Sequence, residues 1–220
     1  MYMSGVCIFC DIAASDNSTQ WYDRPIWRVP GLALLVPSLG ALVPGYLLLV
    51  PETHVFSCRQ IKPQLKAALA RMARITTKRL SSLYGPVTMF EHGACREELS
   101  GSSCISHAHL HVVPGTYGLT DYLGEGRTYF ESFEDFLNDP GNSPYLMCKD
   151  PGGSVVSAAD AGLGQYFRRI IAQELLIADE WDYALFPRLN HISSTYEDLG
   201  NWDDQVEFKL LSTDSQSLEY

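Results

Sequence analysis

The chain has 220 residues, of which 46% are hydrophobic and 19% are charged, and its formal net charge at pH 7 is -10. This apolar share is enough for a packed core and argues against wholesale disorder. The negative charge repels phosphate backbones, so we expect no extended nucleic-acid binding. Any phosphorylated substrate must be held by a local cluster of donors.

The N-terminus lacks the basic start and the continuous apolar run of a signal peptide. The apolar stretch 32–50 is interrupted by prolines and glycines, which argues against a membrane span. Of the six cysteines, only Cys7 and Cys10 form a close pair, and this scatter favours a reducing compartment over a disulfide framework. We therefore expect a cytoplasmic protein with no membrane partner.

The first half of the chain predicts strands, a helix and two more strands. Apolar runs between 27 and 50, separated by proline and glycine, are typical of successive antiparallel strands. Residues 61–84 carry apolar side chains at helical spacing, and strands are predicted again at 87–90 and at about 105–113. The fold class expected for a first domain, residues 1–115, is α+β: an antiparallel sheet with a long packed helix.

Residues 116–220 differ in character, and we expect them to form a C-terminal extension packed on the first domain. The extension begins with an aromatic, acidic part and has turn signals at 139–141 and 150–153. Residues 163–178 have an amphipathic helical pattern, whereas the chain after about 197 is acidic and lacks periodicity. The extension therefore predicts at least one docked helix and an acidic tail.

Three histidines alternate with small or apolar residues over 107–113. Because strand side chains alternate between faces, His107, His109 and His111 are predicted to share one face, about 6.6 Å apart, while the residues between them face the core. A row of imidazoles provides hydrogen-bond donors and acceptors along one phosphate chain. Neutral imidazole is also a nucleophile at physiological pH, so we favour covalent catalysis.

Two other interpretations of these histidines remain. Isolated histidines are usually solvated or hydrogen-bonded structural residues, although strict alternation beside an apolar face is hard to obtain by chance. A catalytic zinc site with three histidines normally takes two ligands from one strand and the third from elsewhere. Three consecutive positions on one face spread too widely for one tetrahedral ion, which makes this alternative less attractive.

The segment 107–113 resembles the signature of the histidine-triad superfamily. Cys7-Ile-Phe-Cys10 is similar to the start of many bacterial members, and 44–55 resembles the family's strand that ends in proline and a nearby histidine. The resemblance covers about residues 5–115. It implies that His109 attacks the α-phosphorus of a nucleotide-like substrate and forms a phosphoramidate. His111 is then the candidate donor to the phosphate oxygens, and His107 would orient the strand. Many members form dimers, which makes a homodimer an expectation here.

The spacing of Cys7 and Cys10 lets both thiolates reach one zinc ion, which needs two more ligands. The pair is also compatible with two reduced cysteines beside an apolar Ile-Phe pair. The resemblance implies that His54 and His107 complete a closed structural site. We expect this zinc and no organic cofactor.

Several positions depart from the better-known nucleotide-binding members and are similar to a branch with a C-terminal extension. Tyr46 stands in place of an active-site histidine, Ser38 in place of an aspartate that holds the ribose, and Cys104 in place of a serine. The segments 37–40, 90–93 and 165–169 carry the likeness to that branch.

Polar residues near the histidines are the further candidates for substrate binding. Glu91 and His92 are expected either to contact substrate or to form a pair behind the histidines. Four arginines could neutralise phosphate charge, although a surface role is open for each: Arg96, Arg127, Arg168 and Arg169. The substrate-binding set is Ser38, Glu91, His92, Cys104 and Arg168.

These patterns predict a nucleotidyl hydrolase that acts on a nucleotide phosphoanhydride, ester or phosphoramidate. One alternative is a nucleotidyl transferase that uses phosphate or a small biosynthetic acceptor, although the intact His111 argues against the phosphorylase subtype. The other alternative is a non-catalytic nucleotide-binding protein.

Overall fold

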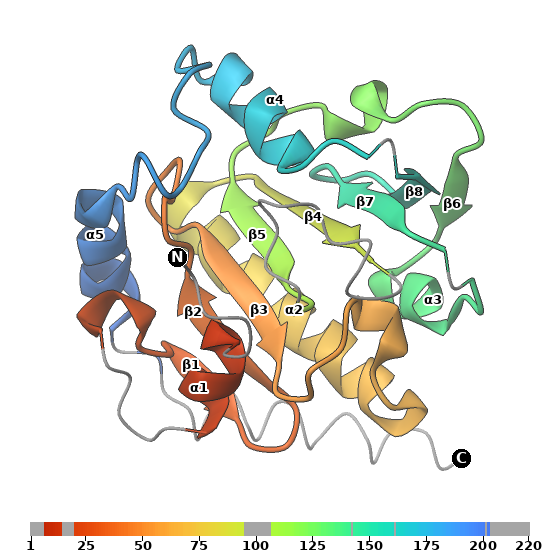
Figure 1. The fold of residues 1–220 in the computed structure, drawn as a ribbon, viewed down its shortest axis with the longest axis horizontal. Helices are drawn as coiled ribbons and strands as arrows, with labels where there is room; N and C mark the ends of the chain where they lie inside the picture. The colour runs from red at the N-terminus through yellow and green to blue at the C-terminus, as the bar shows by residue number, and fades with distance from the viewer. Residues whose placement is uncertain are drawn as a thin grey trace.

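The computed structural model describes residues 7–14, 20–94, 107–141, 143–160, 162–200 and 202. Within them, one sheet of eight strands has the order β1-β2-β3-β5-β4-β7-β8-β6, and neighbouring strands are antiparallel (Figure 1). The strands are β1 (Trp27–Val29), β2 (Ala33–Pro37), β3 (Leu47–Pro51), β4 (Val87–Gly93), β5 (Leu110–Pro114), β6 (Thr128–Phe130), β7 (Tyr145–Lys149) and β8 (Val155–Ala159). The predicted α+β class with an antiparallel sheet is confirmed.

Helices cover both faces of this sheet. Figure 1 shows α2 behind the central strands and α1 in front of β2 and β3. Short 3-10 turns lie at 21–23, 58–60 and 119–122. The helices are α1 (Ile8–Ala14), α2 (Pro63–Tyr84), α3 (Phe133–Asn138), α4 (Tyr166–Glu174) and α5 (Leu189–Leu199).

Helix α2 has clear sequence causes and confirms the helix predicted at 61–84. Pro63 occupies its first turn, where the missing N–H leaves no bond unmade. Gly85, at φ 83°, ends the helix in a conformation that suits glycine. The buried positions recur at spacings of three or four: Leu69, Met72, Ala73, Thr76 and Leu80.

The alternation of β5 separates two apolar layers. Leu110 and Val112 face the core beneath α2, together with Ala108, whereas Val113 belongs to the layer on the opposite face. The prediction that the residues between the histidines face the core is therefore confirmed. The regular strand begins at Leu110, so His107 and His109 lie just before it, and the start predicted near 105 lies outside the described residues.

The chain beyond 115 continues the sheet as well as covering it. Strand β7 pairs with β4, and β8 links β7 to β6. The sequence indicated a docked helix, which is present as α4 within the predicted 163–178, but it did not indicate these strands or α5. The acidic tail from 203 onward lies outside the described residues.

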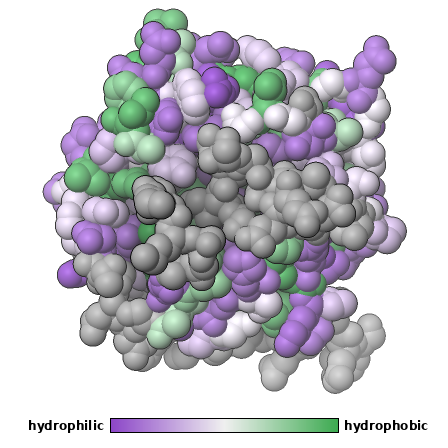
Figure 2. Space-filling model, in the orientation of Figure 1, coloured by the Kyte–Doolittle hydropathy of each residue, from purple (hydrophilic) through white to green (hydrophobic). Residues whose placement is uncertain are grey.

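The surface of the face drawn in Figure 1 is mixed in character. Among the described residues on this face, Figure 2 shows hydrophilic side chains with small hydrophobic groups between them. Within the described part of the chain, no helix combines the length and apolarity needed to cross a bilayer.

Candidate active site and metal centre

His109 lies immediately before β5 with one ring nitrogen fixed by the backbone. Its Nδ1 is 2.7 Å from the carbonyl oxygen of His107. A carbonyl oxygen only accepts hydrogen bonds, so Nδ1 carries the hydrogen. Burial lowers the pKa of His109 from 6.5 to about 4, which keeps the ring neutral. The unshared electron pair of His109 is therefore on Nε2, the nitrogen needed for nucleophilic attack.

His111 follows on the same face, with its ring centroid 4.7 Å from that of His109. Its Nδ1 is 2.7 Å from the Tyr46 phenol oxygen. The ring of Phe90 stacks on His111 at 4.2 Å and an interplanar angle of 11°. Burial lowers the pKa of His111 well below its usual value, so this ring is also neutral.

A second cluster brings together the four residues for which the sequence predicted a metal. Their ligand atoms all lie within 4.8 Å of one another, so Cys7, Cys10, His54 and His107 could hold a metal ion. His107 Nδ1 is 3.3 Å from Cys7 Sγ and 3.6 Å from Cys10 Sγ, and His54 Nδ1 is 3.2 Å from Cys10 Sγ.

The orientation of His107 suits a ligand in this cluster. Its Nε2 lies 2.7 Å from the carbonyl oxygen of Pro51 and must donate to it. The electron pair of the neutral ring is thereby left on Nδ1, which faces the cysteine thiols. A backbone carbonyl that fixes the tautomer of a histidine ligand is a common feature of metal sites.

The helix α1 connects the two clusters. Cys10 lies in this helix and Cys7 directly precedes it. Between the two cysteines, Phe9 packs against the rings of both His107 and His109, at centroid distances of 5.7 and 5.6 Å. Helix α1 thus touches the candidate nucleophile as well as carrying the thiols.

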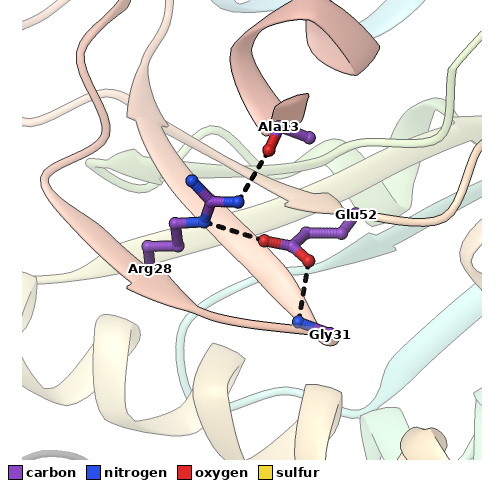
Figure 3. A network of polar contacts seen from close by, with 4 residues as sticks. All are labelled: Ala13, Arg28, Gly31 and Glu52. Atoms are coloured by element: carbon purple, nitrogen blue, oxygen red, sulfur yellow. Dashed lines mark hydrogen bonds and ion pairs between the residues drawn. The ribbon is translucent and has the colours of Figure 1, made fainter. Parts of the chain in front are cut away.

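A polar network holds the end of α1 to the sheet (Figure 3). The Arg28 guanidinium donates to the Ala13 carbonyl at 2.6 Å and to the Glu52 carboxylate at 2.9 Å. Glu52 also accepts the Gly31 amide at 2.7 Å. A cation at the C-terminal end of a helix interacts favourably with the helix dipole. These bonds dock α1 on β1 and β3 without requiring a metal.

Arg168 of α4 reaches the histidine face from the C-terminal extension and is 5% exposed. It donates to the Gly40 carbonyl at 2.7 Å and to the Trp181 carbonyl at 3.1 Å. Its charge contributes to lowering the pKa values of His109 and His111. Among the described residues, no carboxylate forms an ion pair with it.

The other arginines predicted to neutralise phosphate have no contact with the histidines among the described residues. Arg127 donates to the carbonyls of Leu123 and Gly124, and Arg169 stacks over the Trp181 ring at 3.5 Å. Arg96 and Cys104 lie outside the described residues.

The neighbours Glu91 and His92 point to opposite faces of β4. The His92 ring pairs with Asp160 at 2.9 Å and its charge acts on both His109 and His111. Glu91 instead faces the α2 side, where it accepts the Cys58 amide at 2.8 Å and the Tyr145 hydroxyl at 2.6 Å. Of the predicted pair, the structure brings only His92 near the histidines.

Ser38 is buried at the end of β2 and its hydroxyl donates to the adjacent Leu39 carbonyl at 3.3 Å. Its amide donates to the Tyr46 carbonyl at 3.0 Å. These bonds place Ser38 beside the residue that contacts His111, rather than against the histidine rings themselves.

Tyr46, Phe90 and Phe9 contact the histidines but were not among the predicted site residues. The resemblance had already put Tyr46 at the position of an active-site histidine. Strand alternation points the same way, because Tyr46, Leu48 and Val50 lie in the apolar layer opposite α2. No sequence signal paired Phe9 with His109, which is 100 positions away.

The chain matches no model of a known protein family and, by sequence, no curated protein. The assignment of a function therefore rests on the residues and their geometry.

Proposed function

We propose that this chain is a histidine-triad hydrolase that cleaves a nucleotide phosphoanhydride, ester or phosphoramidate through a nucleotidyl-His109 intermediate. One observation carries this proposal: the hydrogen bond from His109 Nδ1 to the His107 carbonyl leaves Nε2 of a neutral ring as the nucleophilic atom. A free imidazole in water would distribute its proton between the two nitrogens, whereas this ring is pre-organised for attack.

The reaction follows in two displacements. His109 Nε2 attacks the α-phosphorus, a P–N bond forms, and the bond from phosphorus to the leaving group breaks with its electron pair on that group. Water then attacks the same phosphorus, the P–N bond breaks, and Nε2 recovers its electron pair while the water proton passes to solvent. The His107 carbonyl stabilises the ring in between, because the positive charge on the substituted imidazole is shared by Nδ1–H.

Arg168 and His111 supply the charge stabilisation that nucleotidyl transfer requires. Both are buried; the His111 ring is 4.7 Å from the His109 ring, and the charge of Arg168 acts on His109. A buried donor interacts more strongly with a developing negative charge than a solvated donor. Arg168 has the fixed positive charge, and His111 offers a neutral donor. The C-terminal extension is therefore part of the proposed active site.

We further propose that the ion held by the cysteine and histidine cluster is zinc with a structural role. In a tetrahedral site with bonds of roughly 2.0–2.3 Å, donor atoms lie about 3.3–3.8 Å apart. Three of the six separations, 3.2, 3.3 and 3.6 Å, are close to this range, and all six are within 4.8 Å, so small side-chain movements would complete the geometry when the ion binds. Four protein donors close the coordination sphere, so bound zinc would fasten α1 to the sheet.

The test compares wild type with His109→Ala and with the control His191→Ala. His191 belongs to α5, and its Nδ1 donates to the Ala41 carbonyl at 2.7 Å. Each protein is incubated with adenosine and guanosine phosphoramidates and dinucleoside polyphosphates. Release is followed by chromatography and adducts by intact mass. We expect release by wild type and His191→Ala, and a loss of at least about a thousandfold in His109→Ala. Full activity of His109→Ala, or neither release nor adduct from any compound, would contradict the proposal.

A further inference from the structure

A buried chain of polar groups leads from α4 to the third histidine. Arg168 lies against Tyr46, with its guanidinium carbon 5.5 Å from the phenol ring centroid, so a fixed positive charge stands beside the buried phenol. Tyr46 in turn lies 2.7 Å from His111 Nδ1. Tyr46 is fully buried between them.

The chemistry of these groups determines where each proton lies. A guanidinium is a cation with donors only, so it favours the orientation in which the phenol hydrogen points away from it. The phenol keeps its proton, because burial raises the pKa of Tyr46 to about 12. Among the described residues, the hydrogen-bond partner of this hydroxyl is His111 Nδ1, so the hydroxyl donates there. His111 Nδ1 must then hold an electron pair, and the hydrogen of the neutral ring is on Nε2.

We propose that Arg168 is a positioning residue that acts through Tyr46 to fix His111 in the tautomer with its proton on Nε2. As part of the proposed hydrolase, this would make His111 a hydrogen-bond donor to the phosphate or leaving group, while its neighbour His109 has the opposite tautomer and acts as nucleophile. Nucleophile and donor would thus be distinguished by the groups that bind their Nδ1 atoms, a carbonyl for His109 and a phenol for His111.

Neighbouring residues hold Arg168, Tyr46 and His111 in place. The stacking of Phe90 fixes the plane of the His111 ring, and Phe167 of α4 packs on Phe90 at 5.1 Å. Gly40 lets the Arg168 guanidinium approach its carbonyl, because a Cβ there would lie 3.1 Å from Nη2 and 2.6 Å from the Tyr183 Cα. The φ of Gly40, 68°, also favours glycine.

The first measurement is the tautomer of His111 in the substrate-free protein with 15N-labelled histidine. Long-range 1H–15N spectra distinguish protonated from unprotonated ring nitrogens, and His111→Gln identifies the signals. We expect wild-type His111 to be protonated on Nε2 only. Tyr46→Phe, which removes one oxygen atom, and Arg168→Met should both give a mixture of tautomers, whereas Arg168→Lys retains a charged donor and should largely preserve the wild-type spectrum. Tyr117→Phe is the matched control, because its buried hydroxyl binds the Pro114 carbonyl.

The second measurement is steady-state kinetics on the same variants. We expect kcat to fall roughly tenfold or more in Tyr46→Phe and Arg168→Met, with KM changed much less, and Arg168→Lys to recover part of the loss. A wild-type His111 protonated on Nδ1, or a tautomer unchanged in folded Tyr46→Phe, would overturn the inference whatever the activity. Absence of both product release and a His109 adduct would instead contradict the proposed function and leave the tautomer result standing.

Discussion

His109 and His111 lie side by side, with ring centroids 4.7 Å apart, and each ring is hydrogen-bonded to the protein through Nδ1. The partners have opposite character, since the His107 carbonyl can only accept and the Tyr46 hydroxyl has a proton to donate. Two chemically identical side chains can therefore take different roles in one reaction. The difference lies in the groups behind the rings and is invisible in the alternating sequence.

The pH dependence of activity should reflect the neutral state of His109. Burial lowers its pKa to about 4, so the proposed nucleophile remains neutral well below the usual histidine pKa of 6.5. We expect the acid limb of the kcat/KM profile near pH 4, in a range where circular dichroism shows the protein folded. An acid limb near 6.5 would show that the ring titrates as an exposed histidine.

The same burial has a consequence for stability. Between pH 6.5 and about 4 the unfolded chain takes up a proton at His109 that the folded chain does not. The contribution of this neutral ring is thus present above pH 6.5 and is lost as the pH falls through that window. Urea unfolding at several pH values should show a smaller decline in the His109→Ala variant than in wild type.

Metal binding should stabilise the N-terminal helix. We expect about one zinc ion per chain in protein purified without chelator, and loss of the ion in Cys7→Ala. Loss of about 3 kcal/mol of binding-linked stability would lower Tm by roughly 6–12 °C, because each kcal/mol corresponds to about 2–4 °C in a chain of this size. Cys148→Ala is the control for metal content, since Cys148 lies buried in β7 away from the cluster. A metal-free wild type would contradict the assignment.

How much of this site could be predicted depended on the range of the interaction. The alternation of 107–113 is local, and it correctly predicted the core-facing residues such as Leu110. The metal cluster joins Cys7 to His107, and it was found only through the family resemblance. The contact of Arg168 with Gly40 spans 128 positions and depends on how α4 packs, which no local pattern encodes. For Glu91, the local pattern could have corrected the prediction. Its neighbour His92 faces the site, so strand alternation places Glu91 on the other face.

The network of Arg28 should position α1 independently of the metal. Arg28→Met removes the hydrogen bonds to the Ala13 carbonyl and to Glu52. Because the Arg28 and Glu52 side chains are partly exposed, we expect a loss of only about 1 kcal/mol in stability. The larger effect should be on metal exchange, because α1 with its cysteines would open more often. Chelator competition should show faster zinc release at unchanged stoichiometry, and a wild-type release rate would show that the metal alone holds the helix.

Glu91 offers a test of the two faces of the sheet. Its carboxylate is buried against Cys58 and Tyr145, and burial raises its pKa above 4.5. A raised pKa means that its contribution to stability is complete below pH 4.5 and is lost as the pH rises through the folded-state value. In Glu91→Gln, the amide oxygen can still accept one of these bonds without a buried charge. We expect activity within about twofold of wild type and a flatter dependence of unfolding free energy on pH. A large loss of activity with unchanged Tm would place Glu91 in the substrate site after all, on the face where the structure places His92.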